Sequence, residues 1–309
     1  MSFYSVPEDE LMERVMRFKD EDHEYLYDIG HSLADEFYKV KLGTCTDITG
    51  YPYSGKSLFL KEILFNTSVL HGLKHMIYMP DDGSVEEVVA NMIHKFTGKT
   101  FNPKYPNVIS PSEIEKGVRW FHKHFKIIDR NMDDDKSRPK MAPEEFWEMV
   151  VRDGDIHTGT IDSWNFLDVA DNPRALAGHL TFRNELCQKY EKHFFTIIHP
   201  RNPTANDFDK EGRLRPPSTY NLMGGSEWNN NGKNIIVVHK EVKEGDAYDI
   251  YFRKIKPRIV GKTGHISLGF DIPTQKFYQV QGGPNPKKYS DATETLKKEL
   301  RISDEDLGF

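Results

Sequence analysis

The sequence predicts an α/β fold with a mainly parallel sheet, helices on both faces and an antiparallel extension near the C-terminus. Three observations lead to this prediction. A glycine loop of the form G-x-x-x-x-G-K-S, from Gly50 to Ser57, lies between a β-prone run and a run of helix formers. Apolar runs of strand length, such as 75–79 and 194–198, alternate with segments of helical pattern, as in parallel sheets with helical crossovers. A hairpin expected over 249–256 supplies the antiparallel part.

The composition limits the kind of protein. The chain has 309 residues, of which 37% are hydrophobic, enough for a sizeable core in one large domain or two small ones. A net charge of -6 argues against a uniformly basic nucleic-acid coat but does not exclude a local basic groove. Two cysteines, Cys45 and Cys187, are too few for a disulfide framework. No apolar run is long enough for a membrane helix and the N-terminus is acidic, so we expect a soluble, cytoplasmic protein without membrane contact.

The loop from Gly50 to Ser57 is the predicted nucleotide site. Its glycines allow backbone N–H groups to surround a phosphate chain, and the following helix directs its positive dipole end there. In this pattern Lys56 reaches the β- and γ-phosphates and the Ser57 hydroxyl binds Mg²⁺. We therefore expect Mg²⁺ and ATP, or another NTP, as cofactors, and the nucleotide-binding residues to be Gly50, Ser54, Gly55, Lys56 and Ser57. The alternative is an accidental glycine turn.

An amphipathic helix is predicted before the first core strand. Residues 8–20 place apolar side chains among many charges. This helix either folds onto its own domain or docks on a neighbouring subunit. We therefore expect 1–27 to be a linker and docking segment and 28–283 to be the main domain.

Two acids follow the predicted strand 75–79. Asp81 and Asp82 stand at its carboxyl end, where a general base meets an attacking water if the strand is central in a parallel sheet. The alternative is that both are turn residues. Ser84 then begins a predicted helix that ends at Thr97.

Polar residues also end two later strands. The apolar run 158–161 ends in Asp162, the Walker B pattern in which the carboxylate holds the Mg²⁺ shell through water. The run 194–198 ends at His199, which either senses the γ-phosphate or has a structural role. The other expected elements are a helix from Ser112 to His124, a strand over 125–128, a charged loop over 132–140, a loop over 167–178, a helix from about 180 to 192, a flexible connection over 202–221, a strand over 234–238 and a polar, acidic tail over 284–309.

Taken in order, these landmarks resemble the RecA-like motor domain of superfamily 4 replicative helicases, which include DnaB and, more closely, the Twinkle-like helicases. The resemblance runs from Asp28 to Tyr278. It includes the phosphate loop, the strand before Asp81, the run Gly98-Lys99-Thr100-Phe101, the Walker B strand and the histidine motif at His199.

The resemblance implies roles for further residues. Lys256 and Arg258 look like the K-x-R finger that reaches the next subunit's site. Phe270 stands near the position of an aromatic that stacks on the nucleotide base, or else it packs in the core. The loops after Asp162 and around Gly225 are expected to contact DNA, with the candidate residues Arg174, Gly225, Ser226, Asn229 and Lys233.

The function implied is NTP-driven translocation on single-stranded DNA and duplex unwinding during replication by a homo-oligomeric ring, most often a hexamer. Two residues depart from the family pattern, because Asp81 replaces a glutamate and Lys233 an aspartate. We expect no primase or zinc domain before the motor, and the short format is typical of a phage protein. Two alternatives stay open: a RecA- or KaiC-like ATPase in recombination or regulation, and a nucleotide-binding ring component that does not hydrolyse.

The end of the predicted tail has the character of a docking peptide. Residues 303–309 combine three acids with Leu307 and the terminal Phe309, which suits a basic pocket on a primase, a polymerase or a single-strand-binding protein. The alternative is a frayed, solvated end.

Overall fold

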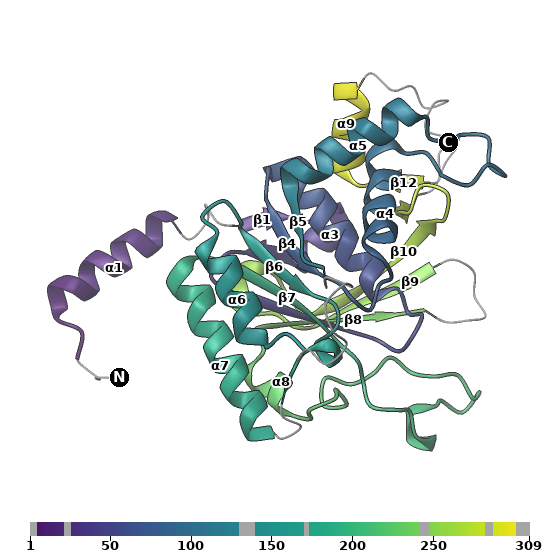
Figure 1. Ribbon diagram of the computed structural model, residues 1–309. Helices are drawn as coiled ribbons and strands as arrows, with labels where there is room; N and C mark the ends of the chain where they lie inside the picture. The colour runs from purple at the N-terminus through teal and green to yellow at the C-terminus, as the bar shows by residue number, and fades with distance from the viewer. Residues whose placement is uncertain are drawn as a thin grey trace.

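A ten-stranded mixed sheet forms the centre of the protein in the computed structural model, which describes residues 5–21, 26–129, 140–169, 173–240, 247–281 and 287–300 (Figure 1). Its strand order is β12-β11-β10-β9-β8-β3-β7-β6-β4-β5. The strands are β3 (Cys45–Thr49), β4 (His75–Tyr78), β5 (Phe125–Ile127), β6 (Thr158–Ile161), β7 (His193–Ile198), β8 (Asn234–His239), β9 (Ala247–Lys254), β10 (Gly264–Asp271), β11 (Lys276–Val280) and β12 (Lys287–Tyr289). A separate antiparallel pair joins β1 (Leu26–Asp28) to β2 (Lys39–Lys41).

The half of the sheet from β8 to β5 is parallel throughout. β3 lies between β7 and β8, β6 joins β7 to β4, and β5 forms the edge. β3, β4, β6, β7 and β8 are buried along their whole length, whereas the edge strand β5 exposes Lys126. Apolar residues and threonine predominate in these strands, as expected of a parallel sheet covered on both faces. Their carboxyl ends meet at one edge of the sheet, which is where ligands bind in folds of this kind.

The other half, from β9 to β12, is antiparallel and confirms the predicted extension. The predicted hairpin over 249–256 was wrong in detail. Most of that stretch lies in one strand, β9, which returns alongside β8 and then pairs with β10. Its alternating pattern of buried and less buried residues, typical of one half-buried strand, does not reveal where the chain turns.

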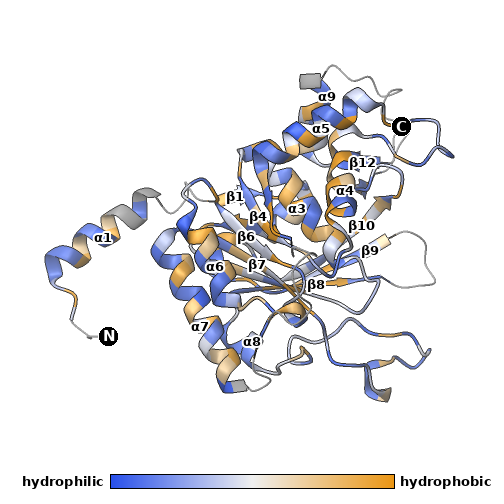
Figure 2. Ribbon diagram, viewed as in Figure 1, coloured by the Kyte–Doolittle hydropathy of each residue, from blue (hydrophilic) through white to orange (hydrophobic). Residues whose placement is uncertain are grey.

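Helices cover both faces of the sheet, as predicted. The helices of the described residues are α1 (Glu8–Glu21), α2 (Ser32–Asp35), α3 (Lys56–His71), α4 (Val85–Thr97), α5 (Pro111–His124), α6 (Pro143–Arg152), α7 (Pro173–Tyr190), α8 (Glu227–Asn231) and α9 (Asp291–Leu300), with short 3-10 turns η1 (Trp164–Phe166), η2 (Ala205–Asp207) and η3 (Arg258–Val260). One apolar core lies under α3, α4, α5 and α9, and a second lies under α6, α7 and α8. Figure 2 shows the apolar colouring on the strands and on the helices packed against them.

Helix starts follow local capping chemistry. Ser84 accepts a hydrogen bond from the Glu87 N–H while the Glu87 side chain caps the Ser84 N–H, so α4 begins and ends as predicted. The same reciprocal pair, Ser110 with Glu113, begins α5 at Pro111, slightly earlier than the predicted start at Ser112.

Two predicted boundaries were wrong. The loop expected over 167–178 ends where α7 begins, because Pro173 occupies the first helical position, which proline tolerates. The stretch expected as a tail from 284 contains β12, which extends the sheet, and α9, whose Ala292 and Leu296 are buried in the core under α3. The docking peptide predicted over 303–309 and the charged loop over 132–139 lie outside the described residues.

The predicted N-terminal helix is present as α1 and lies away from the rest of the fold (Figure 1). Its apolar side chains remain half exposed, at 50% for Leu11, 59% for Met12 and 53% for both Val15 and Met16.

In the part of the chain that the structure describes, no helix is long and apolar enough to cross a membrane.

A buried ion pair fixes the strand that leads into the glycine loop. Asp47 of β3 accepts two hydrogen bonds from Arg183 of α7, at 2.6 and 3.1 Å, and both side chains are fully buried. Arg183 also donates to Thr196 of β7. Because removal of one partner would leave an uncompensated buried charge, we expect an Arg183→Leu change to cost about 3–5 kcal/mol of stability.

Candidate active site

The glycine loop connects β3 to α3 at the carboxyl edge of the sheet. A side chain at Gly50 would place its Cβ 2.2 Å from the Val238 carbonyl oxygen, so the loop requires glycine there. Gly55 has φ of 87° and is the residue before α3, and a Cβ there would meet the ring of Tyr248 at 2.4 Å. The loop is therefore closely packed against β8 and β9. The first N–H groups of α3, which follow it directly, are of the kind that a helix leaves without a partner of its own and that can bind a phosphate.

Lys56 begins α3 and is nearly buried, with 8% of its surface exposed. Its ammonium donates to the Tyr51 carbonyl oxygen at 3.2 Å, within the loop itself. Burial lowers the pKa of Lys56, whereas the negative charges of Asp162 and Asp81 act in the opposite direction. A cation held in this position has the geometry to bind a phosphate group.

Asp162 follows β6 and is 1% exposed. Burial raises the pKa of its carboxyl group to about 7, the nearby charge of Asp82 adds to the increase, and a hydrogen bond with Ser57 opposes it. Its Oδ2 atom has no hydrogen-bond partner among the described residues. A buried carboxylate oxygen without a partner, next to a serine hydroxyl, fits the oxygen ligands that Mg²⁺ requires.

The two acids after β4 have different partners. The Asp81 carboxylate lies 2.9 Å from Nε2 of His199, which follows β7. The Asp82 carboxylate accepts a hydrogen bond from Nζ of Lys61 in α3, at 2.7 Å. The Asp81 N–H also donates to the Asp162 carbonyl oxygen at 3.3 Å, so the turn after β4 lies directly beside the end of β6.

The structure thus brings together residues that the sequence analysis selected from four separate strand ends: Lys56, Ser57, Asp81, Asp82, Asp162 and His199. Sequence reasoning missed Lys61 and Tyr248. The helical spacing between Ser57 and Lys61 places both on one side of α3, which was the available signal for Lys61.

Phe270 is buried in β10. It is 6% exposed and packs with its ring against Tyr248 and Phe277, at centroid distances of 5.7 and 5.0 Å. These contacts favour core packing of the two interpretations offered for it. The aromatic ring next to the loop is that of Tyr248, over which Lys240 lies at 4.8 Å.

Lys256 and Arg258 lie at the opposite edge of the sheet from the glycine loop. β9 runs antiparallel to β8, and its last residue, Lys254, pairs with Ile235 at the start of β8. The Lys256 N–H donates to the side chain of Asn234, the first residue of β8. Arg258 follows in η3, so this arginine cannot reach the phosphate loop of its own chain across the length of the sheet.

The segments expected to bind DNA are partly helical. Arg174 lies in the first turn of α7, and Asn229 lies in α8, a short helix that the sequence analysis did not expect. Trp228 of α8 packs edge to face on Trp164 of η1 at 5.0 Å, so the segment after Asp162 lies beside the Gly225 segment.

Lys233 ends the Gly225 segment, two residues after α8. It directly precedes β8, at the edge of the sheet where the parallel strands begin. Its charge, together with that of Lys256, lowers the pKa of Lys254, although burial of Lys254 is the larger cause. Lys233 therefore lies close to the K-x-R segment.

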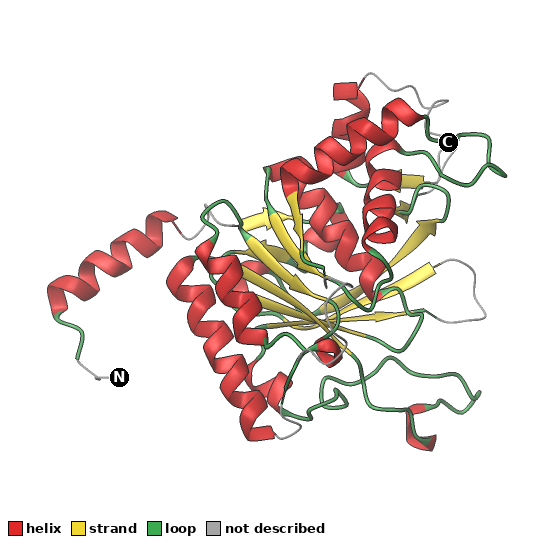
Figure 3. Ribbon diagram, in the orientation of Figure 1, coloured by secondary structure: helices red, strands yellow, loops and turns green. Residues whose placement is uncertain are grey.

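A further segment, which we call the arm, covers residues 200–222. The sequence analysis expected a flexible connection here. The structure shows an extended loop whose ends pair through Pro200 and Leu222 and whose middle pairs through Phe208 and Leu214 (Figure 3). The arm is braced by ion pairs from Arg201 to Asp207 and from Arg213 to Asp209, and it also carries Lys210 and Arg215.

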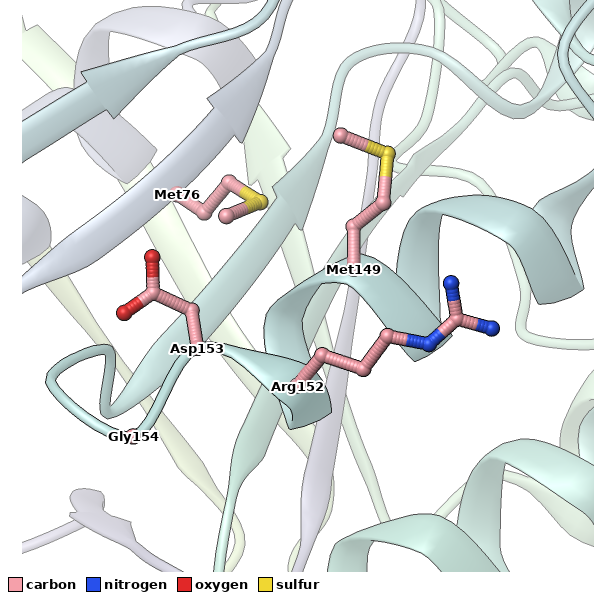
Figure 4. Close-up of a pocket in the computed structure, with 5 residues that line it drawn as sticks. All are labelled: Met76, Met149, Arg152, Asp153 and Gly154. Carbon is pink, nitrogen blue, oxygen red and sulfur yellow. The ribbon is translucent and has the colours of Figure 1, made fainter.

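A hollow of about 480 Å³ lies at the edge of the sheet where the parallel strands begin, far from the glycine loop (Figure 4). Met76, Met149, Arg152, Asp153 and Gly154 line it. Its two charged side chains already form ion pairs, Arg152 with Glu148 and Asp153 with Lys126. We therefore assign this hollow no part in the site.

The fold and the carboxyl-edge residues define a RecA-like P-loop NTPase domain. The solved structures with a similar fold include the following two. One is an ATPase domain, with a TM-score of 0.68, 12% identity and coverage of 89% of this chain and 99% of that one. The other is a DnaB-like replicative helicase studied with its interactions with primase, with a TM-score of 0.65, 12% identity and coverage of 89% and 67%. No known family model matches the chain.

In sequence, the chain is similar to a Twinkle homolog protein, chloroplastic/mitochondrial, of Arabidopsis thaliana. The two are 26% identical over 288 residues, which cover 86% of this chain and 39% of the relative. The chain therefore spans about two fifths of that relative's length. The predicted resemblance to the DnaB- and Twinkle-like superfamily 4 helicase motor domains is confirmed.

Proposed function

We propose that this chain is the motor of an ATP-dependent replicative DNA helicase that moves along single-stranded DNA and unwinds duplex. The single observation that carries the proposal is the convergence of Lys56, Ser57, Asp162, Asp81 and His199 at one edge of the sheet. Similarity to a Twinkle homolog supports the DNA substrate. The fold alone would not select a function, because RecA-like domains serve several.

Each residue has a distinct part in the proposed hydrolysis. Lys56 and the first N–H groups of α3 would hold the β- and γ-phosphates. Ser57 and Asp162 would bind Mg²⁺, which supplies charge neutralisation of the phosphates when present. Asp81 would orient the attacking water and accept its proton, and His199 would fix the Asp81 carboxylate and respond to the state of the γ-phosphate.

The position of Arg258 supports action between subunits. Its guanidinium is planar and permanently charged, so it suits the charge that grows on the transferring phosphoryl group. Because η3 is at the edge opposite the glycine loop, Arg258 would serve the site of a neighbour in a head-to-tail ring, with Lys256 beside it. An arginine supplied in trans is worth about 10³–10⁵ in rate, so an isolated subunit would hydrolyse slowly. We propose a hexamer, with α1 docking on a neighbouring subunit.

In this proposal, η1, the start of α7 and the segment from Gly225 to Lys233 would contact DNA. The arm would be a further contact, which the sequence did not predict. Backbone N–H groups and cations such as Arg174 would hold DNA phosphates without reading bases. Binding would therefore be independent of sequence.

The partners and location follow from the same proposal. The docking peptide predicted over 303–309 would bind a primase, a polymerase or a single-strand-binding protein. Interaction with primase is named for the DnaB-like helicase of similar fold. Cys45 and Cys187 are free and buried, which fits the proposed cytoplasmic location, including that of a host cell if the protein comes from a phage.

A strand-displacement assay on forked DNA tests the function. The proposal predicts ATP-dependent separation by the unaltered chain and none by Lys56→Ala. ATP hydrolysis without strand separation would indicate a RecA- or KaiC-like ATPase. Nucleotide binding without hydrolysis would indicate a ring component in which Asp81, one methylene shorter than glutamate, no longer reaches the water.

A further inference from the structure

Lys61 is, with Tyr248, one of the residues near the candidate active site that neither the family resemblance nor the sequence patterns selected. It lies one turn after Ser57 on α3, and only 2% of its side chain is exposed. Its ammonium contacts the Asp82 carboxylate at 2.7 Å, and that carboxylate is itself only 15% exposed. A charge-assisted hydrogen bond in such a position is stronger than one on an open surface.

This ion pair fixes a turn that carries a second, adjacent acid. The Asp82 N–H donates to the Met79 carbonyl oxygen at 3.2 Å, and the Asp81 N–H donates to that of Asp162 at 3.3 Å. The first of these main-chain bonds closes the turn after β4, and the second joins the turn to the end of β6. The Lys61 contact is the side-chain bond that draws Asp82 toward α3, and Asp81 is then left to face His199 at 2.9 Å.

The pair also separates like charges. Asp82 lies beside two other acids, Asp81, which is the preceding residue, and Asp162, whose carbonyl oxygen accepts a hydrogen bond from the Asp81 N–H. Without Lys61, the Asp82 carboxylate would lose its cation in a confined site with two other acids. It would then turn away or compete with Asp81 for the same partners.

We propose that Lys61 is a positioning residue for hydrolysis, which binds Asp82 and thereby directs Asp81 toward His199 and the γ-phosphate. This inference rests on the proposed ATPase function. It predicts that the two adjacent acids are not interchangeable: Asp81 acts on water, and Asp82 acts only through Lys61.

The test measures single-stranded-DNA-stimulated ATP turnover together with equilibrium binding of a fluorescent ATP analogue and thermal melting. Lys61→Met should lower kcat by about 10- to 100-fold, the scale of a misplaced catalytic group, with KM and analogue binding nearly unchanged. Lys61→Arg, which keeps the charge, should restore most of kcat. Lys74→Met is the matched control, because Lys74 also pairs with an aspartate, Asp155, but at the opposite edge of the sheet.

Asp82→Asn serves as the second variant if Lys61→Met does not fold. It should lower kcat like Lys61→Met, and the double variant Lys61→Met/Asp82→Asn should be no worse than either single one, because all three break the same contact. Unaltered kcat in folded Lys61→Met, or a parallel loss of kcat, analogue binding and melting temperature, would overturn the positioning role. Absence of turnover in the unaltered chain would instead overturn the proposed function and this inference with it.

Discussion

The Asp81 carboxylate contacts His199 at 2.9 Å across the width of the strand that lies between them. Asp81 follows β4 and His199 follows β7, with β6 and its Asp162 in the middle. If a change at the γ-phosphate moves His199, the position of the Asp81 carboxylate would therefore change as well. A movement of Asp81 would likewise change the position of His199. This contact links the proposed base to the proposed sensor of the γ-phosphate.

Asp81→Asn should therefore reduce ATP turnover by about 100-fold or more, since removal of a general base costs 10²–10⁴ in rate. Nucleotide binding should persist, because Lys56, Ser57 and Asp162 are unchanged. Single-turnover hydrolysis and analogue binding measure the two effects separately. Asp82→Asn should reduce turnover less, and the reverse order would identify Asp82 as the base.

Arg258 should act on the neighbouring subunit. Arg258→Ala subunits keep the phosphate loop but lack the finger, and Lys56→Ala subunits keep the finger but lack a working phosphate loop. Each variant should therefore be nearly inactive alone. Mixed rings contain interfaces with an intact loop and an intact finger, and they should recover part of the DNA-stimulated hydrolysis. If the mixture is shown to co-assemble and recovers nothing, the arginine serves its own subunit.

Binding to single-stranded DNA should weaken with salt and show no base preference. The logarithm of the affinity should fall linearly with the logarithm of salt, by about 0.7 for each phosphate neutralised. Arg174→Ala and Lys233→Ala should each lessen that slope, while Lys116→Ala, an exposed change on α5, should not. Fluorescence anisotropy with homopolymers of different bases measures both properties. A strong preference for one sequence at fixed salt would contradict the proposed backbone contacts.

Buried histidines should make the fold sensitive to acid. His75 of β4 is fully buried, and burial, together with His157 and His124, lowers its pKa to about 3. In the unfolded chain the His75 imidazole has the ordinary pKa of about 6.5. Between pH 6.5 and pH 3 the unfolded chain therefore binds a proton that the folded chain does not, and the free energy of unfolding falls as pH falls. The loss is about 1.4 kcal/mol per pH unit for such a group, or about 2 kcal/mol at about pH 5.

His75→Gln should accordingly show a smaller loss of stability between pH 7 and pH 5 than the unaltered chain. Urea unfolding at the two values measures the difference. His265→Gln, at an exposed position on β10, is the control and should leave the pH dependence unchanged. An equal loss of unfolding free energy in the unaltered chain, His75→Gln and His265→Gln would mean that a group other than His75 causes it.

Local patterns predicted most of the parallel sheet and the site within it. A glycine loop between a strand and a helix, and acids or a histidine directly after apolar runs, specify both the elements and the edge at which they meet. For this reason Lys56, Ser57, Asp81, Asp162 and His199 were found from sequence. The partner of each acid could not be predicted in this way. The Lys61–Asp82 pair, for example, joins residues 21 positions apart on different elements.

The wrong predictions have physical causes as well. The loop expected over 167–178 is shorter than predicted because Pro173 can occupy the first position of a helix and begins α7. The polar composition of 284–309 concealed α9, in which Ala292 and Leu296, four residues apart, are enough to bury one face against α3. The two interpretations of Phe270 stayed open because its burial depends on which face of β10 is covered, which only the tertiary structure decides.

ATP turnover with and without single-stranded DNA tests the central claim most directly. The unaltered chain should hydrolyse ATP slowly alone and severalfold faster with DNA, since DNA would assemble or reposition the ring interfaces that contain Arg258. Lys56→Ala should abolish both rates, because it removes the cation nearest the β- and γ-phosphates. Turnover that is indifferent to DNA, or that survives Lys56→Ala, would contradict the assignment of this site as the motor of a helicase.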